Sequence, residues 1–545
     1  MSSVSDNEVK VETKVCRCWV HFDITDKDLE FYDKVSPVFA WVKYQISTPA
    51  LCPKCREIRR MSFKNDRKLY KSTCSATWKE IISIFSPDKP YKIYNQKDWW
   101  SDNWNWKDYW FDFDFSKSFF EQFQNLVVNV PRIALMNYNS ENSEYWNYAW
   151  GNKNCYLVVG GSWENENCSY GTNFMKSADC MDCFWARECV NSYEVYWSNK
   201  MYDSSYCLNS SNSRNCHFSI NIDWCDNCIF CTDLINKSYH IYNKPVSKQE
   251  FEDMKNEFIA HSDLERNKKI FHDMLSSEAE KWKIMIHSSE DVEWNYILDS
   301  KNLHHSFLIN KVENGKYVFF ANYCSNVMDS TNAWLEYPEY LYETINCWKW
   351  GYRISFCQWA WNNNKDIFYC DTISACNDCF WCTWLKNQQY CILNKQYTKE
   401  EYEILVPKII EHMKSSWEWW EYFPSSISPF GYNETVAMEY YPMDGRDALQ
   451  CVSTDGRAIF KWSDYENPMP NVVKIIPASK LPENITEIPD DIINWAIESE
   501  ISKKPYRIIK QELDYYRKHS LPIPRKHPDE RHQDRVEILL AFKSF

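Results

Sequence analysis

Four cysteines near the N-terminus form two close pairs of the kind that bind a metal ion. Cys16 and Cys18 are separated by one residue, and Cys52 and Cys55 are separated by two. Two tight turns that each direct two thiolates to one point can complete a tetrahedral zinc site. We therefore predict Zn²⁺ bound by Cys16, Cys18, Cys52 and Cys55, with His21 as a substitute ligand because the first pair is unusually close. The alternative is four unrelated free thiols.

A basic run follows the second cysteine pair. Such a run could contact nucleic-acid phosphates, but the formal net charge of the whole chain is −14, which does not favour nucleic acid in general. We favour the alternative that the run is the solvated face of a helix or ribbon. The candidate phosphate-binding residues are Arg56, Arg59, Arg60, Lys64, Arg67 and Lys68.

Two cysteine-rich segments in the middle of the chain are copies of each other. Residues 225–252, CDNCIFCTDLINKSYHIYNKPVSKQEFE, align without gaps with residues 376–403, CNDCFWCTWLKNQQYCILNKQYTKEEYE. Both copies end in a Ser/Thr-x-x-Glu capping box, which starts a helix at the same place in each. The match indicates an internal duplication.

Single cysteines recur at steps of 21 to 23 residues within each copy, as from Cys168 to Cys189 and from Cys347 to Cys370. Short apolar pieces broken by Asn, Ser and Asp at this period predict the coils of a parallel β-solenoid. Stacked coils would place the cysteines in buried ladders, where a small apolar side chain fits well. The alternatives are a second zinc or iron–sulfur site and redox thiols, but neither copy has the Cys-Pro that completes a ferredoxin run.

Glycine is rare in this chain and tryptophan is abundant. There are 9 Gly and 28 Trp, whereas a chain of this length would ordinarily contain roughly 38 Gly. Several tryptophans stand where a turn usually needs glycine, as at Trp19 and Trp78. We infer that most of them are UGA codons that the source organism reads as glycine. A protein that is truly rich in tryptophan is the alternative.

The segment CRCWVHFDITDKDLEFYDKV, followed by PALCPKCREIRRMSF, resembles a bacterial zinc-ribbon domain. Residues 14–535 also resemble a larger uncharacterised family from bacteria with reduced genomes, some of which read UGA as glycine. The resemblance implies a zinc site but no reaction. It further implies true tryptophans at Trp99, Trp100, Trp419 and Trp495. Glycines are implied at Trp19, Trp41, Trp78, Trp110, Trp417 and Trp420.

The C-terminal part has Pro-rich loops and a helical region over residues 489–519. His527, Asp529, His532 and Asp534 could serve a metal or acid–base role, but we favour a solvated tail. The resemblance implies a further Cys-pair module after this point. Because the chain instead ends VEILLAFKSF, we expect a truncated or frameshifted C-terminus.

These features predict a mainly β protein with helical linkers, a zinc ribbon, a duplicated solenoid and a small mixed C-terminal region. No catalytic motif stands out, so we expect a non-enzymatic zinc-binding scaffold with a protein or nucleic-acid partner. The alternatives are a β-helix enzyme acting on a polymer and a nucleic-acid-binding protein. We expect it in the cytoplasm, because the chain has no 18-residue apolar stretch and no signal peptide. The expected parts are a zinc ribbon (1–75), a connecting region (76–140), solenoid copy 1 (141–246), a helical linker (247–291), solenoid copy 2 (292–397), a helix and loop (398–424), and the C-terminal region (425–545).

Overall fold

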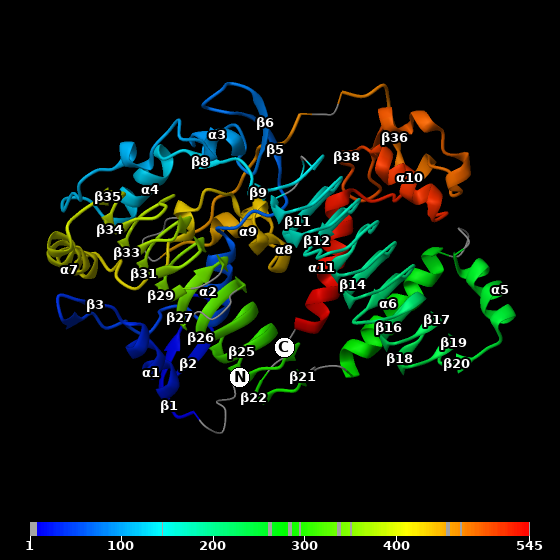
Figure 1. Ribbon diagram of the computed structural model, residues 1–545, viewed down its shortest axis with the longest axis horizontal. Helices are drawn as coiled ribbons and strands as arrows, with labels where there is room; N and C mark the ends of the chain where they lie inside the picture. Colours follow the sequence, from blue (N-terminus) through cyan, green and yellow to red (C-terminus); the bar gives the residue numbers. More distant parts are fainter. Residues whose placement is uncertain are drawn as a thin grey trace. The chain divides into compact units, whose positions relative to one another are not determined.

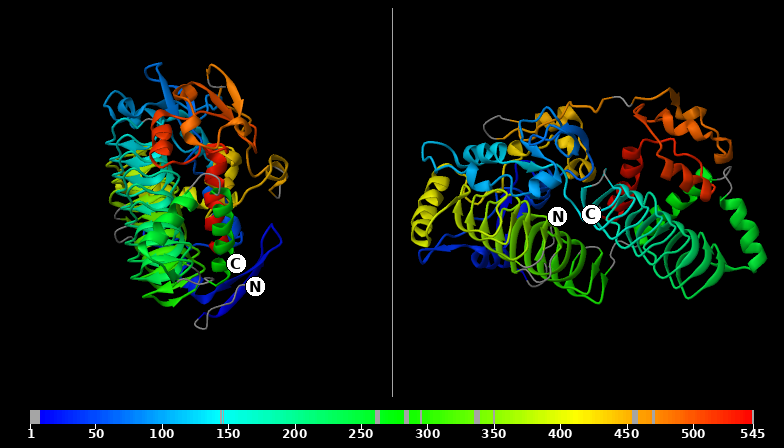
Figure 2. Two further views of the ribbon diagram at one scale, coloured as in Figure 1. Left: turned by 90° about the vertical axis from the view of Figure 1, so that its right-hand side faces the viewer. Right: turned by 45° about the horizontal axis from the view of Figure 1, so that its top comes forward.

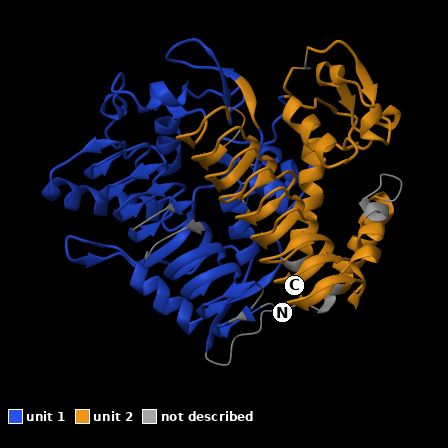
Figure 3. Cartoon of the chain, turned by 45° about the vertical axis from the view of Figure 1, so that its right-hand side comes forward, with its two compact units in different colours: residues 1–68, 72–134, 283–465 blue, residues 69–71, 135–282, 466–545 orange. Residues whose placement is uncertain are grey.

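The computed structural model describes residues 8–143, 145, 147–259, 264–281, 286–293, 296–334, 339–348, 351–453, 458–468 and 471–543. The chain forms two compact units (Figure 3). Unit 1 contains residues 1–68, 72–134 and 283–465, and unit 2 contains residues 69–71, 135–282 and 466–545. Each unit contains one parallel β-solenoid, and the two together have about 19 turns (Figures 1 and 2). The predicted class, mainly β with a duplicated solenoid, is confirmed.

Unit 1 combines the N-terminal elements with the second solenoid copy. Its helices are α1 (Asp26–Val35), α2 (Pro53–Met61), α3 (Gln96–Trp100), α4 (Phe119–Asn129), α7 (Lys399–Ser415), α8 (Val436–Tyr440) and α9 (Gly445–Gln450). Its short strands outside the solenoid are β1 (Lys10–Val15), β2 (His21–Thr25), β3 (Val38–Phe39), β4 (Val42–Lys43), β6 (Glu80–Ser83), β7 (Ile93–Tyr94) and β8 (Arg132–Ile133), and β5 (Tyr70–Thr73) is divided between the units.

The solenoid of unit 1 consists of short parallel strands. They are β21 (Ile286–His287), β22 (Glu290–Val292), β23 (Ile297–Leu298), β24 (Lys301–His304), β25 (Phe307–Lys316), β26 (Phe319–Trp334), β27 (Glu339–Ile345), β28 (Cys347–Trp348), β29 (Gly351–Ser355), β30 (Ala360–Trp361), β31 (Asn364–Phe368), β32 (Ile373–Ser374), β33 (Asn377–Phe380), β34 (Gln389–Ile392) and β35 (Lys395–Gln396). Only the last strand, β35, turns back antiparallel to its neighbour.

Unit 2 combines the first solenoid copy with the C-terminal region. Its solenoid strands are β9 (Asn137–Tyr138), β10 (Asn147–Trp150), β11 (Tyr156–Trp163), β12 (Ser169–Thr172), β13 (Phe184–Arg187), β14 (Tyr193–Asn199), β15 (Ser205–Leu208), β16 (Arg214–Asp223), β17 (Asp226–Ile229), β18 (Thr232–Ile235), β19 (Ser238–Ile241) and β20 (Lys244–Pro245). The other elements are α5 (Lys248–Ile259), α6 (Leu264–Lys281), β36 (Ile475–Pro477), β37 (Ala496–Glu498), β38 (Pro505–Tyr506), α10 (Lys510–Lys518) and α11 (Pro528–Lys543).

One solenoid coil consists of four triplets of residues, so it is much shorter than the repeat expected from the cysteine spacing. Tyr193 pairs with Ser205, and Ser205 pairs in turn with His217. In the 12-residue coils the first side chain of each triplet points inward, the second points outward and the third forms a corner, whereas a few coils contain one or two extra residues. The cysteine spacing of 21 residues was misleading because it equals seven triplets. Two residues seven triplets apart both point inward, but they lie on different sides of the coil because a full turn takes four triplets.

The corner of each triplet has a left-handed backbone. From Asn191 to Tyr242 every third residue has φ between 46° and 57°. Asn tolerates this region best among residues with a side chain, and corner amides form ladders from coil to coil, as Asn209 Nδ2 donates to Asn221 Oδ1 at 3.2 Å. The left-handed region therefore explains the frequent Asn and Asp of the solenoid segments.

Most inward positions hold Cys, Ser or aliphatic side chains, and a few hold others, such as Phe174 and Asn165. The Ser219 hydroxyl donates to the carbonyl of His217 at 2.9 Å and accepts the N–H of Cys231, one coil later, at 3.1 Å. The Cys225 thiol donates to the carbonyls of Asp223 and Leu234. A small polar side chain at an inward position thus serves as the hydrogen-bond partner of backbone groups inside the coil, where water does not reach. The cysteines lie in the two buried cores, so the predicted ladder is confirmed.

The helical expectations are confirmed in part. The capping boxes at Ser247 and Thr398 both form, and they begin α5 and α7. The helix expected near residue 489 is wrong over its first part, because residues 490–494 form a 3₁₀ turn and residues 496–498 form β37. Pro505 and the pairing of β37 with β38 make this segment a hairpin, which the helical spacing of its apolar residues did not indicate.

We expect Ser219→Ala to destabilise unit 2 by about 1–3 kcal/mol, because it leaves the buried N–H of Cys231 without an acceptor. Ser211→Ala is the matched control. Ser211 occupies an outward position, and its loss should change the free energy of unfolding by no more than about 0.5 kcal/mol. Urea denaturation of the full chain measures both. Equal effects of the two variants would contradict the role given to the inward hydroxyl.

Candidate metal centre

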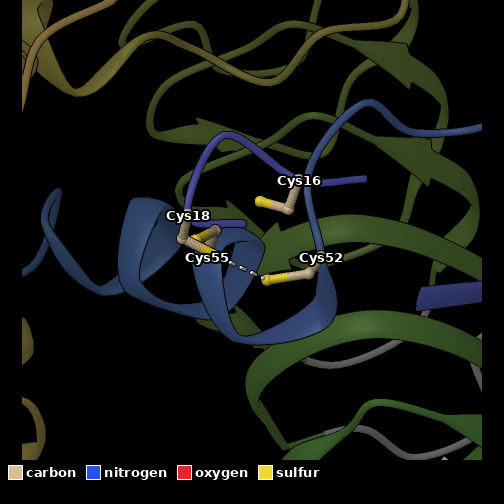
Figure 4. A group of neighbouring side chains, drawn as sticks. All are labelled: Cys16, Cys18, Cys52 and Cys55. Carbon is tan, nitrogen blue, oxygen red and sulfur yellow. Dashed lines mark hydrogen bonds between the residues drawn. The ribbon is translucent and has the colours of Figure 1, made fainter. Parts of the chain in front are cut away.

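The four N-terminal cysteines meet at one point. The sulfur atoms of Cys16, Cys18, Cys52 and Cys55 all lie within 4.8 Å of one another (Figure 4), and the Sγ atoms of Cys18 and Cys52 are 3.6 Å apart. A tetrahedral zinc ion with Zn–S bonds of about 2.3 Å requires sulfur atoms about 3.8 Å apart. The arrangement can therefore hold one metal ion with modest tightening. His21 lies outside this group.

A hairpin turn and a helix start position these cysteines. The first pair lies in the turn between β1 and β2, where the N–H of Cys16 donates to the carbonyl of Val20 at 2.9 Å. Trp19 closes this turn with φ at 65°, a conformation that suits glycine. Cys52 is the N-cap of α2, Pro53 follows at the first helical position, and Cys55 lies in the first turn.

The local electrostatics favour one thiolate. The hydrogen bond from the Cys55 thiol, assisted by the backbone N–H of Cys55, lowers the pKa of Cys52 to about 5. The same hydrogen bond raises the pKa of Cys55, and burial raises the pKa of Cys18. A cation placed among the four sulfurs would favour loss of the remaining protons, because metals bind thiolates rather than thiols.

The basic run is buried rather than solvated. Arg56 and Arg60 are each 1 % exposed and Arg59 is 6 % exposed. They pack against two carboxylates on the solenoid of unit 1, Asp329 and Glu343, which are themselves buried. The favoured expectation of a solvated face is wrong for these residues. Lys64 and Arg67 are also buried and Lys68 is half-buried, so this run offers little surface to a nucleic acid.

Two of these arginines clamp one aspartate. Arg56 Nε lies 2.9 Å from Asp329 Oδ2, and Arg60 Nη1 lies 3.4 Å from Asp329 Oδ1. The arginines are four residues apart, so they lie on one face of α2. Asp329 is a left-handed corner of the solenoid with φ at 51°. The clamp therefore attaches the segment that carries Cys52 and Cys55 to the solenoid of unit 1.

Unit 2 contains the same clamp. Arg531 Nη1 lies 2.5 Å from Asp182 Oδ2, and Arg535 Nη1 lies 2.7 Å from Asp182 Oδ1. Asp182 lies 46 residues before Cys228 and Asp329 lies 50 residues before Cys379. The four extra residues are those of one 14-residue and two 13-residue coils in the second solenoid. Asp182 and Asp329 thus occupy equivalent corners of equivalent coils in the two solenoids.

The C-terminal region is a second copy of the N-terminal segment. DLEFYDK at 28–34 matches ELDYYRK at 512–518, and PKCREIRR at 53–60 matches PDERHQDR at 528–535. Tyr32 packs on Tyr342 in unit 1, and Tyr516 packs on Tyr193 in unit 2. These matched motifs could have revealed the duplication from the sequence, but they were not predicted because the C-terminal copy lacks the cysteines. The expectation of a solvated tail is wrong, since Arg531, His532 and Arg535 are buried.

The C-terminal copy replaces the cysteines. His527 and Glu530 stand at the positions of Cys52 and Cys55, and Ser502 stands at that of Cys18. The Glu530 carboxylate accepts the Ser499 hydroxyl at 2.6 Å, the Ser502 N–H at 2.8 Å and the His527 N–H at 2.9 Å. Burial raises the pKa of Glu530, but these hydrogen bonds outweigh it and the pKa is lowered overall. A hydrogen-bonded anion thus joins the hairpin to the helix in place of the cysteine cluster.

The remaining chemistry-bearing residues do not gather into a second metal site. Within the described ranges, the tetra-cysteine group is the one cluster of His, Cys, Asp or Glu close enough to hold an ion. The search of the same ranges for a helix long and apolar enough to span a membrane found none. Comparison of the chain with protein-family models, with curated proteins and with solved structures found no match.

We expect Asp329→Ala and Asp182→Ala each to destabilise their own unit by about 3–5 kcal/mol, because each removes the carboxylate that two buried guanidinium groups share and leaves them only one other, Glu343 or Glu512. Asp226→Ala is the control, since it removes the exposed Arg214–Asp226 pair and should cost at most about 1 kcal/mol. Thermal unfolding and limited proteolysis measure these effects. Loss of stability no greater than that of the control would contradict the clamp.

Proposed function

We propose that Cys16, Cys18, Cys52 and Cys55 bind one structural Zn²⁺ ion, and that the protein is a non-enzymatic scaffold built on two solenoids. The observation that carries this proposal is the counterpart in unit 2, where a hydrogen-bonded carboxylate stands in place of the cysteines. There a hairpin and helix of the same sequence pattern attach to the same solenoid corner with Glu530 at the centre. A group that one copy replaces with a carboxylate has a structural role rather than a catalytic one.

The cluster itself supports a closed site. Four cysteine ligands complete the tetrahedral coordination that structural zinc prefers and leave no open position for a substrate. Cys16 and Cys52 are buried among Phe22, Ile24 and Leu51, which limits access of water to the ion. Binding of the metal would then be coupled to folding of the hairpin onto α2.

Two supporting inferences concern the setting and the partner. All 24 cysteines are free thiols, which is the usual state in a reducing compartment such as the cytoplasm. The arginines of α2 are engaged with solenoid carboxylates, so a protein partner for the solenoid surfaces is better supported than a nucleic acid at the basic run. No described feature favours the alternative of a β-helix enzyme acting on a polymer.

We expect the full-length chain to bind one zinc ion, measured by elemental analysis after dialysis. Cys18→Ser should abolish stoichiometric binding. Cys451 is a half-buried cysteine outside the cluster, so Cys451→Ser should leave binding unchanged. Chelation should increase amide exchange over residues 53–61 and leave residues 528–535 unaffected, because the C-terminal copy has no metal ligand of this kind.

The full chain is the right material for this test. A truncation lacking residues 1–75 would also remove Arg56, Arg59 and Arg60 and leave Asp329 and Glu343 buried without cations. Zinc retained at one ion per chain when all four N-terminal cysteines are Ser would contradict the assigned site and indicate a metal in the solenoid ladders. Unchanged exchange over α2 after chelation would contradict the structural role.

We also infer that many of the tryptophans are glycine in the natural protein. Trp19, Trp41, Trp78 and Trp417 have φ between 58° and 67° and are more than four-fifths exposed, and Trp420 has φ at 67°. Trp110, expected as a sixth glycine, has φ at −87° and gives no such support. Trp99, by contrast, is buried and its indole N–H donates to Pro131, as a true tryptophan would. The codons of the gene decide this, and UGG at every position would refute it.

We expect Trp41→Gly and Trp417→Gly each to stabilise the chain by about 1 kcal/mol, because glycine removes the left-handed strain. Trp110→Gly is the matched control. It relieves no such strain and should lower the free energy of unfolding by about 0.5–1 kcal/mol through the greater freedom of the unfolded chain. Chemical denaturation measures all three, and a stabilisation shared by Trp110→Gly would contradict the assignment to φ.

A further inference from the structure

The hairpin that carries Cys16 and Cys18 has an open outer edge in unit 1. Within the described residues, β1 and β2 form a sheet of two strands (Figure 1), whereas the matching hairpin of unit 2 belongs to a sheet of three. There β36 pairs in parallel with β37, which is the counterpart of β1. The duplication therefore allows the same hairpin edge to be compared with and without a neighbouring strand.

The backbone of β1 directs Thr13 outward. The N–H of Cys16 donates to the carbonyl of Val20 at 2.9 Å and closes the hairpin, and Lys14 pairs with Phe22 two residues further from the turn. In an antiparallel ladder, residue pairs that exchange hydrogen bonds alternate with pairs that do not. Thr13 belongs to a pair of the second kind, so its N–H points away from β2. Among the described strands, β2 alone pairs with β1.

The third strand of unit 2 uses the equivalent backbone group. The N–H of Ser499 donates to the carbonyl of Lys504 at 3.1 Å and closes this hairpin in the same way, so Ala496 stands at the position of Thr13. The N–H of Ala496 donates to the carbonyl of Lys474, the residue before β36, at 3.0 Å. An extended segment thus occupies in unit 2 the edge that is open in unit 1.

The open edge also carries apolar side chains. Val9, Val11 and Val15 lie in or next to β1, and each of them is more than half exposed. In β37, by contrast, Ala496 and Ile497 are fully buried. An exposed edge strand with apolar side chains is a template for pairing with another strand, and natural proteins usually cover or interrupt such an edge. The edge of β1 therefore has the character of a binding surface.

We propose that β1 is a docking site for an extended segment of a partner protein, which adds to the hairpin as a parallel third strand. The partner segment has the chemistry of residues 473–477, VKIIP, in which β-branched residues lead to a proline. Main-chain hydrogen bonds to the outward groups of Thr13 would supply affinity, and side chains beside Val11 and Val15 would supply selectivity. This site goes beyond the zinc scaffold, because it uses backbone groups and not the thiols.

The probe for this site is a synthetic peptide of residues 471–480, NVVKIIPASK, which contains the strand that covers the edge in unit 2. We expect it to bind the full chain with a dissociation constant of about 100 μM. Hydrogen exchange should slow over residues 10–15 when the peptide is bound. Exchange over residues 496–498 should not change, because β36 already covers that edge.

Thr13→Pro removes the outward N–H but keeps the hydrogen bonds between β1 and β2, so it should weaken peptide binding at least tenfold. Thr13→Ala is the matched control, since it also loses the hydrogen bond from the Thr13 hydroxyl to Asp23 but keeps the N–H. It should bind as the unmodified chain does. Val15→Lys is a second blocking variant, because a lysine on an edge strand opposes pairing. Unchanged exchange over residues 21–25 would show that the hairpin stays folded in each variant.

Equal binding by Thr13→Pro and Thr13→Ala would place the peptide elsewhere and overturn the proposal. So would the absence of slower exchange over residues 10–15 at saturating peptide. Self-association of the unmodified chain that Thr13→Pro abolishes, measured by sedimentation, would assign the edge to a second copy and would also overturn it. None of these results bears on the zinc site, whose test is the metal content of the chain.

Discussion

The left-handed corner that ends every triplet of the solenoid is the constraint on which the rest of this structure depends. One residue in three must take a conformation that costs most side chains about 1–2 kcal/mol. Four such corners close a coil, so that Tyr193 already meets Ser205 on the next coil. Most triplets of such a narrow coil place a small side chain in its interior, which explains the frequent inward Ser and Cys, and the left-handed backbone explains the frequent corner Asn and Asp.

The same geometry explains why most thiols of this cysteine-rich protein lie apart from the candidate metal site. An inward Ser or Cys pairs backbone groups that the parallel ladder leaves unpaired, as Ser219 does for Cys231. Thiols such as Cys225 hydrogen-bond to carbonyls of their own coil and the next. The solenoid thiols fit the interior because they are small and can donate to carbonyls, whereas the four N-terminal thiols lie close to one another.

Each solenoid is capped on one side by a helix that carries two arginines, and both clamps hold a corner aspartate. A buried ion pair of this kind contributes little net stability but strongly disfavours any other placement of its partners. The hairpin meets the helix at the four-cysteine cluster in unit 1 and at the Glu530 carboxylate in unit 2. The two copies therefore share the arginine–aspartate clamp but differ in the residues that lie between the hairpin and the helix. The two solenoids also differ in their side chains, as where unit 1 has Phe368 at the position of His217 in unit 2.

The sequence by itself determined the duplication, the solenoid class, the helix starts at Ser247 and Thr398, and the grouping of Cys16, Cys18, Cys52 and Cys55. These follow from local spacing and from the similarity of one segment to another, which need no knowledge of distant contacts. Only the tertiary structure decided the coil length, because a spacing of seven triplets and a full coil look alike in one dimension. It alone decided that Arg56 and Arg60 are buried, since their partner Asp329 lies in a distant part of the sequence. It likewise decided that β36 covers the edge of β37 whereas β1 pairs with β2 alone among the described strands, because the pairing of strands that are separated in the chain is not encoded in the local pattern of residues.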